Sequence, residues 1–182
     1  GDVYKRQVYI VKGGGNVGLE SLSGDDLVKE IIESEGNAIY RLAYSYLKNT
    51  HDAEDVLQDT LVQFLKTKPE FESKEHRKAW LLRVASNLSK NRLKLAYRNF
   101  SVLDEEIPTT QDFTEEESEV LRAVHSLPAK YRDVIYLFYY EGYHTEEIAG
   151  ILNKRDATVR SLLSRARKKL KTTLKEAYDF HE

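Results

Sequence analysis

Bases and hydroxyls recur at helical spacing near the end of the chain. A helix over residues 156–175 would turn Val159 inward and present the opposite side to solvent. Lysine and arginine hold phosphates, and short hydroxyls reach base edges, so this face predicts DNA binding. The alternative is an ordinary basic surface on a helical hairpin. The face comprises Arg160, Ser161, Ser164, Arg165 and Lys168.

The residues around this face have the spacing of a helix-turn-helix motif. Small Ala149 allows two helices to cross closely, and Asn153 tolerates a left-handed turn. Val159 follows ten residues after the alanine and packs the second helix on the first. We expect Thr145 to cap the first helix and Asp156 to cap the second.

A second candidate DNA site lies in the middle of the chain. Asn87 and Asn91 stand one helical turn apart, and an amide offers both a donor and an acceptor to an unstacked base. Lys90 and Arg92 can attract the backbone of a single strand. Trp80 is interpreted as a core residue, with a stacking platform for single-stranded DNA as the alternative.

An acidic helix face precedes these residues. Asp52, Asp55, Gln58 and Asp59 lie away from the apolar stripe of the same segment, so they suit a basic protein partner or a merely solvated surface. Three acids at this spacing also suit magnesium in a nuclease. Catalytic motifs are otherwise missing from the sequence, and its five histidines are scattered. We therefore expect a protein that is not an enzyme and holds no metal or cofactor.

Helical periodicity runs through the segments that position these residues. Ser23 begins the first apolar stripe, Asn49 and Thr50 separate it from the second, and Pro69 and Ser73 separate the second from the third. No strand pattern competes with these helices. We predict an all-α fold with two small helical domains, the second a four-helix, winged-helix-like helix-turn-helix domain.

Charge is sorted into blocks, although the 182-residue chain has a net charge of only -2. Residues 74–98 hold eight bases against one acid, and residues 154–175 hold nine against one. Residues 104–119 between them hold eight acids and no base. Two basic helices indicate a polyanionic ligand. The predicted divisions are a non-native or disordered extension (1–22), two domains (23–98 and 117–178) and an acidic linker (99–116).

Composition narrows the cellular setting. The chain has no cysteine, which excludes disulfides, cysteine nucleophiles and thiolate-held metals. Its longest apolar run, residues 134–140, is too short to span a membrane. No export signal is recognised at the start. We expect a soluble protein of the cytoplasm.

Three segments make the sequence resemble the extracytoplasmic-function (ECF) group of bacterial RNA polymerase sigma factors. DAEDVLQDTLVQFL (52–65) resembles region 2.2 of that group, and WLLRVASNLSKNR (80–92) resembles regions 2.3 and 2.4. Residues 127–171 resemble region 4. The resemblance covers Asp25 to Leu174 and implies a factor that directs core RNA polymerase to promoters. It also makes an anti-sigma inhibitor plausible.

The resemblance gives the candidate residues specific roles. It implies that region 2 binds the clamp helices of the polymerase and melts the minus-ten element, and that region 4 reads the minus-thirty-five element near the polymerase flap. The expected polymerase contacts are Asp52, Asp55, Gln58 and Asp59. The expected minus-ten contacts are Arg77, Asn87, Lys90, Asn91 and Arg92. The expected minus-thirty-five contacts are Arg155, Thr158, Arg160, Ser161, Ser164, Arg165 and Lys168.

The turn of the helix-turn-helix departs from the family pattern. NKRDA (153–157) stands where relatives more often read like GIPEG, which predicts a looser turn. Leu162 stands where many relatives carry arginine, so it either removes a DNA contact or joins the core. The alternative to a sigma factor is a stand-alone helix-turn-helix regulator whose first module dimerises or binds an effector.

Overall fold

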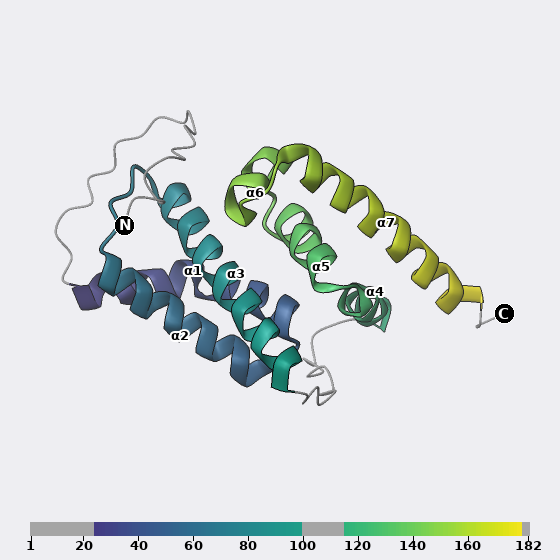
Figure 1. Ribbon diagram of the computed structural model, residues 1–182, viewed down its shortest axis with the longest axis horizontal. Helices are drawn as coiled ribbons and strands as arrows, with labels where there is room; N and C mark the ends of the chain where they lie inside the picture. Colours follow the sequence, from purple (N-terminus) through teal and green to yellow (C-terminus); the bar gives the residue numbers. More distant parts are fainter. Residues whose placement is uncertain (1–23, 100–114, 180–182) are drawn as a thin grey trace.

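The computed structural model describes residues 24–99 and 115–179, and all the secondary structure in them is helical. An N-terminal group contains α1 (Gly24–Leu47), α2 (Thr50–Thr67) and α3 (Lys74–Asn99). A C-terminal group contains α4 (Glu115–Ser126), α5 (Ala129–Ile135), the π-helix η2 (Tyr136–Tyr140), α6 (Thr145–Leu152) and α7 (Asp156–Asp179) (Figure 1). The prediction of an all-α fold is confirmed.

Local side-chain chemistry sets the ends of the early helices. Asn49 caps α2, since its Oδ1 accepts a hydrogen bond from the Asp52 amide at 2.8 Å. α2 ends where Lys68 adopts a left-handed conformation directly before Pro69. Ser73 caps α3, its Oγ accepting from the His76 amide at 3.0 Å. The three predicted helix boundaries are therefore correct.

Two predicted caps in the helix-turn-helix are displaced by one residue. α6 is capped by His144 and not by Thr145, because the Glu147 carboxylate accepts from the His144 amide at 2.8 Å. Asp156 is the first residue of α7 and not its cap, since the first carbonyl to accept within the helix is that of Arg155. Its carboxylate still favours the helix N-terminus electrostatically.

The core of the N-terminal group is built from the predicted stripes. α1 continues unbroken through Gly36 and buries Ile39 and Leu42 completely. They meet Val56 of α2 and Leu81 of α3, which are equally inaccessible. Removing this apolar surface from water is the main term that holds three otherwise polar helices together.

The helix-turn-helix packs as its sequence predicts. Asn153 takes the left-handed conformation between α6 and α7, with φ 52°. Val159 and Leu163 of α7 pack into the core with Ala149. Leu162 is also buried, which answers the question raised by its sequence: it joins the core.

The π-helix η2 was not predicted. Its register is seen in the bond from the Glu141 amide to the Tyr136 carbonyl, 3.2 Å long and five residues apart. The wider turn buries Tyr136 and Leu137 while leaving Tyr139 and Tyr140 exposed. Gly142 then ends the segment with φ +71°, a left-handed conformation that suits glycine.

The two helical groups lie against each other. α5 packs on α1, and α6 packs on α3, so that the helix-turn-helix faces the N-terminal group on one side and solvent on the other (Figure 1). No helix in the described ranges is long and apolar enough to cross a membrane. The predicted extension 1–22 and nearly all of the predicted linker lie outside the described residues; Asn99 ends α3, and α4 already begins at Glu115.

Candidate nucleic-acid and polymerase interfaces

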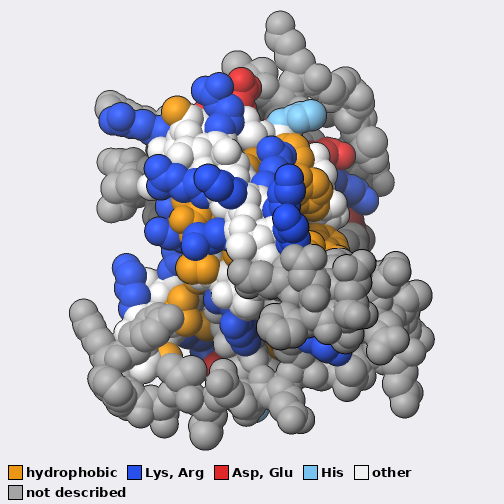
Figure 2. All heavy atoms as spheres, turned by 90° about the vertical axis from the view of Figure 1, so that its right-hand side faces the viewer, with side chains coloured by type: hydrophobic (Ala, Val, Ile, Leu, Met, Phe, Trp, Pro, Cys, Tyr) orange, Lys and Arg blue, Asp and Glu red, His pale blue; other side chains and the backbone are white. Residues whose placement is uncertain are grey.

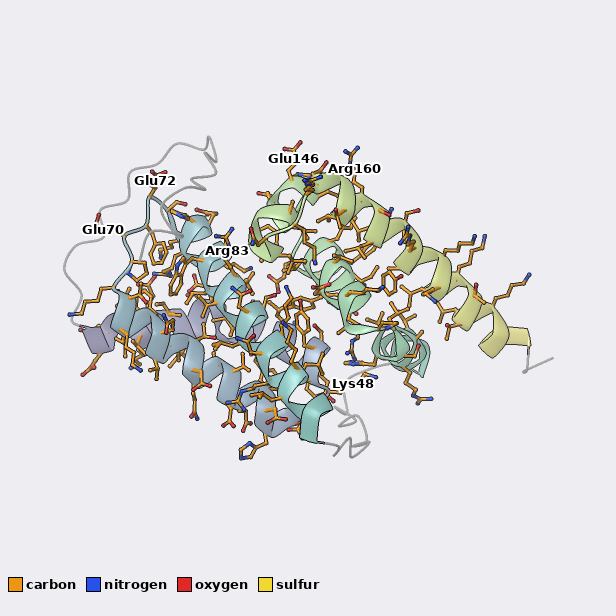
Figure 3. All side chains as sticks on the ribbon, in the orientation of Figure 1. Lys48, Glu70, Glu72, Arg83, Glu146 and Arg160 are labelled. Atoms are coloured by element: carbon orange, nitrogen blue, oxygen red, sulfur yellow. The ribbon has the colours of Figure 1, made fainter. Side chains whose placement is uncertain are left out.

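α7 presents a continuous basic face to solvent. Figure 2 shows lysine and arginine side chains gathered over this end of the molecule. Arg160 points outward from the helix and pairs with Asp156 one turn earlier, at 2.9 Å (Figure 3). The structure brings all seven residues predicted for this site to the exposed side of the turn and of α7. They are Arg155, Thr158, Arg160, Ser161, Ser164, Arg165 and Lys168.

Two features that the sequence did not reveal flank the basic face. On one side, Arg167 lies over the rings of Phe138 and Tyr139 and donates a 2.7 Å hydrogen bond to the Tyr139 hydroxyl. This cation–π contact fixes α7 against η2. On the other side, a groove of about 480 Å³ runs between α7 and the junction of α4 and α5. Arg165 and Lys168 form part of its wall, so they belong to both surfaces.

The residues predicted to capture the minus-ten strand are separated by the fold. Asn87 and Asn91 are exposed on α3. Lys90 is half-buried beneath the C-terminal group, with its ammonium over the Tyr46 ring. Burial lowers the pKa of Lys90, opposed by the nearby Asp133 carboxylate. Only the two asparagines are therefore open to a ligand in this arrangement.

Arg77 has a structural position that its predicted DNA-binding role does not fit. Its residue exposure is 2%, and its guanidinium bonds to the Glu35 carboxylate at 2.9 Å and to that of Glu30 at 3.2 Å. A buried cation with two buried or half-buried acids holds α3 to α1 and offers no charge to DNA. The reason is visible in the sequence: Arg77 precedes Leu81 by four residues and so lies on the buried stripe.

The acidic face of α2 and Arg92 of α3 form one cluster. The Arg92 guanidinium reaches Asp52 at 3.4 Å, Asp55 at 3.2 Å and Asp59 at 3.0 Å. These hydrogen bonds raise the pKa of Arg92 although its partial burial acts in the opposite direction. Arg92, predicted to meet DNA, is thus paired inside the group, while Gln58 and Asp59 stay exposed for a partner.

The same cluster bears on the magnesium alternative. His51, Asp52 and Asp55 bring possible ligand atoms within 4.8 Å of one another. The carboxylates of Asp52 and Asp55 are already bonded to a guanidinium, which competes with a metal ion for them. The cluster is therefore better described as an ion-pair network than as a metal site.

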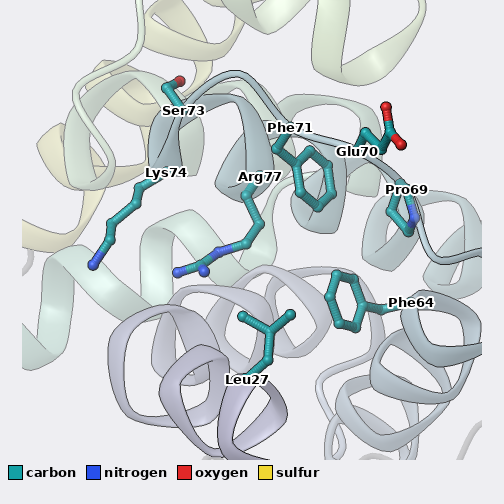
Figure 4. A pocket seen from close by; sticks show the side chains of 8 residues that line it. All are labelled: Leu27, Phe64, Pro69, Glu70, Phe71, Ser73, Lys74 and Arg77. Carbon is teal, nitrogen blue, oxygen red and sulfur yellow. The ribbon is translucent and has the colours of Figure 1, made fainter. Parts of the chain in front are cut away.

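A pocket of about 380 Å³ opens between the start of α1, the end of α2 and the loop that leads into α3 (Figure 4). Phe64 and Phe71 form its aromatic side, their rings stacked with centroids 6.2 Å apart. Lys74 and Arg77 lie at the opposite side. Trp80 packs edge-on against both phenylalanines, in agreement with its interpretation as a core residue.

The contact between the two helical groups contains buried polar groups. The Tyr46 hydroxyl of α1 donates to the Asp133 carboxylate of α5 and lies 3.2 Å from the Ser86 hydroxyl of α3. Arg132 donates to the Tyr46 carbonyl at 3.0 Å. Burial raises the pKa of Asp133 to about 6. The helical pattern gave no sign of this network, because its partners are far apart in sequence.

Two further bonds cross the same contact at its edge. Arg83, which Figure 3 shows between α3 and α6, donates from Nε to the Gly150 carbonyl at 3.1 Å. Lys78 pairs with Glu141 at 2.6 Å. Residues of α3 that face outward in the isolated N-terminal group are thereby used to hold the C-terminal group.

An all-helical chain with a basic helix-turn-helix and a second, partly basic helical group is the architecture of a DNA-binding protein. Family models agree with both groups. Residues 31–98 match sigma-70 region 2, and residues 117–170 match sigma-70 region 4.

Curated relatives match along most of the chain. The ECF RNA polymerase sigma factor SigM of Bacillus subtilis is 31% identical over 154 residues, covering 79% of this chain and 93% of the relative. SigW of the same organism, also an ECF RNA polymerase sigma factor, is 28% identical over 170 residues, covering 83% and 90%. The chain therefore belongs to the ECF RNA polymerase sigma factors. Its role is promoter-specific transcription initiation, and it is not an enzyme.

Solved structures agree with this assignment. The sigma factor RpoE from Bartonella quintana, determined in complex with the anti-sigma factor NepR, is 26% identical with a TM-score of 0.70. The alignment covers 83% of this chain and 98% of that one. CnrH, solved with the cytosolic domain of CnrY, has a TM-score of 0.62 at 24% identity and supports the fold.

Proposed function

We propose that the chain reads a promoter at two places, with α7 on the minus-thirty-five element and α3 on the minus-ten element, while α2 binds core RNA polymerase. The observation that carries the proposal is the presence of two separate polar faces on helices of two separate helical groups. One face is basic and rich in hydroxyls, and the other carries paired amides.

At the minus-thirty-five element, the proposed reader is the exposed face of α7. Ser161 and Ser164 are short enough for base edges in the major groove, and Arg165 has the planar fork that recognises guanine. Lys168, one turn further on, suits a phosphate. Arg160 is already paired with Asp156, so its contribution requires exchanging a carboxylate for a phosphate.

At the minus-ten element, Asn87 and Asn91 are the proposed base-capturing side chains, because they are exposed and one helical turn apart. The pocket beside Phe71 supplies an aromatic wall and a basic rim at the start of the same helix. Stacking on aromatic rings and attraction to cations are the two means by which proteins hold single-stranded DNA. Arg77 supports this site from within the core.

For polymerase binding, the exposed part of the acidic face supports a contact with a basic surface such as the clamp helices. Gln58 and Asp59 are open, and Val62 lies on the same exposed side of α2 with 44% exposure. A polar rim beside exposed apolar side chains is common at protein interfaces. We also propose the polymerase flap as a partner of the C-terminal group, and an anti-sigma protein as an inhibitor, as RpoE has in NepR.

The deciding experiment combines co-purification with transcription. The full chain is mixed with core polymerase, isolated by gel filtration and assayed for run-off transcription from a promoter selected by the complex. We expect stable association and a transcript of defined length. Tight, sequence-specific DNA binding by the free chain with no association with core polymerase would instead identify a stand-alone regulator.

A further inference from the structure

We propose that the free chain holds itself closed, with the C-terminal group docked on the face of α3 that the minus-ten strand requires, and that Tyr46 and Asp133 form the contact that keeps it closed. The closing contact is argued from geometry alone. The statement that it masks a DNA-binding face rests on the proposed function.

The contact is built like a protein interior. Tyr46 is 2% exposed, and Asp133 is 1% exposed, although they belong to different helical groups. Ser86 is fully buried beside them. A buried carboxylate is costly unless it is hydrogen-bonded, and this one is bonded to the Tyr46 hydroxyl and to the Val134 amide. The pairing therefore favours the docked arrangement over one in which only one group contributes.

The docked face coincides with the predicted minus-ten face. Arg83, Asn87 and Lys90 recur every three to four residues and share one side of α3. Two of these three meet the C-terminal group: Arg83 bonds to the Gly150 carbonyl, and Lys90 faces Asp133. Only Asn87 is exposed. A single strand laid along this side of α3 would displace the C-terminal group.

The proposed two-element recognition is geometrically incompatible with docking. The names of the two elements place them about 25 base pairs apart, which is roughly 85 Å of B-form DNA. A compact chain of this length has a radius of gyration of about 16 Å. The two groups must therefore separate before α3 and α7 can reach their elements together. Breaking the contact between Tyr46 and Asp133 is part of that separation.

Distance measurement between introduced labels tests the closed state directly. The sequence has no cysteine, so Lys66→Cys in α2 and Lys171→Cys in α7 provide two unique and exposed labelling sites. Their separation is measured by pulsed electron resonance in the free full chain and in the complex with core polymerase and promoter DNA. We expect one short distance in the free chain and a longer one in the complex. The same long distance in both states would overturn the proposal.

Variants identify the contact responsible. Tyr46→Phe removes one hydroxyl and leaves Asp133 without that bond, so we expect a population with the long distance in the free chain. Arg83→Gln weakens the edge contact independently. Tyr139→Phe is the matched control, because it removes an exposed hydroxyl that bonds to Arg167 away from the contact. Helix content and thermal unfolding identify any misfolded variant. Unchanged distances in folded Tyr46→Phe and Arg83→Gln proteins would contradict the proposal.

Binding of a single-stranded minus-ten oligonucleotide separates masking from closure. If about 90% of the free chain is closed, opening it raises the apparent affinity about tenfold. We expect this gain for Tyr46→Phe, with no gain for Tyr139→Phe. A longer distance without a gain in affinity would mean that the chain closes but that this face of α3 does not bind the strand. In that case the minus-ten assignment fails, while the closing contact stands.

Discussion

The hydroxyl of Tyr46 in α1 donates a hydrogen bond to the carboxylate of Asp133 in α5, 87 residues further along the chain. Both side chains are buried, so neither is free to meet water while the two helical groups remain together. The bond joins the part of the chain that matches sigma-70 region 2 to the part that matches region 4. Both matched regions thus depend on one buried contact for their relative position.

The first prediction concerns pH. Burial raises the pKa of Asp133 from 3.8 to about 6, so the docked, folded chain binds this proton more tightly than the open or unfolded chain. The resulting stabilisation is fully present below about pH 4 and is lost as the pH rises through 6. It amounts to about 3 kcal/mol at most. Lys90 and Lys154 face the carboxylate and oppose its protonation.

A comparison with Asp133→Asn isolates this effect. Burial lowers the pKa of His125 to about 4, with the charges of Arg132 and Lys48 acting in the same direction, so its own contribution to stability falls as the pH falls from 6.5 to 4. That contribution is common to both proteins. The difference in free energy of unfolding between wild type and Asp133→Asn, measured by denaturant titration, should shift in favour of the wild type between pH 7 and pH 4. A constant difference would show that Asp133 does not titrate there.

The second prediction concerns Arg77 as a core residue. Arg77→Ala leaves Glu35 buried and unpaired, and should lower the free energy of unfolding by about 3–5 kcal/mol. Lys74→Ala is the control, because Lys74 also bonds to Glu30 but its side chain is 63% exposed. That change should cost about 1 kcal/mol or less. Equal stability of the two variants, measured by urea unfolding, would return Arg77 to the DNA-binding set.

The third prediction concerns polymerase binding by α2. Asp55→Lys combined with Asp59→Lys reverses two charges of the acidic face and places both beside Arg92. We expect affinity for core polymerase to fall about tenfold or more, since like charges at an interface are strongly unfavourable. The control is Glu33→Lys with Glu54→Lys, an equal charge reversal at exposed positions outside this cluster. Identical losses for the two double variants would indicate a general charge effect.

The fourth prediction separates two kinds of contact on α7. Lys168→Ala should weaken binding to all minus-thirty-five variants alike and reduce the salt dependence by about one phosphate contact, close to 0.9 in log–log slope. Arg165→Ala should relax preference at one base pair, losing about 1–3 kcal/mol of discrimination there. Holoenzyme binding to single-base promoter variants at several salt concentrations measures both. Lys175→Ala, near the far end of α7, should change neither; no effect from any variant would remove α7 from the interface.

The sequence was sufficient for the fold because each helix has a local cause. Asn49 and Ser73 are caps, Asn153 is a turn, and Val159 repeats with Leu163 on an apolar stripe. The sites were harder to predict. Charge type alone does not distinguish Arg77, which is paired in the core, from Arg155, which is exposed. For Arg77, the apolar register of Leu81 was an available signal that charge counting overlooked.

Contacts between distant segments were not predictable in this way. Arg92 appears as one more base in a basic block, and its pairing with three acids of α2 depends on how α2 and α3 cross. Arg132 and Asp133 sit beside an apolar run and are buried only because α5 meets α1. No periodicity in one sequence encodes such a meeting, since the partner lies on another helix.

The π-helix between α5 and α6 sets the rotational phase of everything that follows it. An α-helix turns about 100° per residue, and η2 accommodates one residue more than an α-helical turn would. Deleting a single residue between Tyr136 and Tyr140 would restore regular winding and keep the segment helical. It would also rotate Gly142, α6 and α7 together about the axis of α5. The direction in which the recognition helix faces is therefore fixed by a residue count in a segment remote from its basic face.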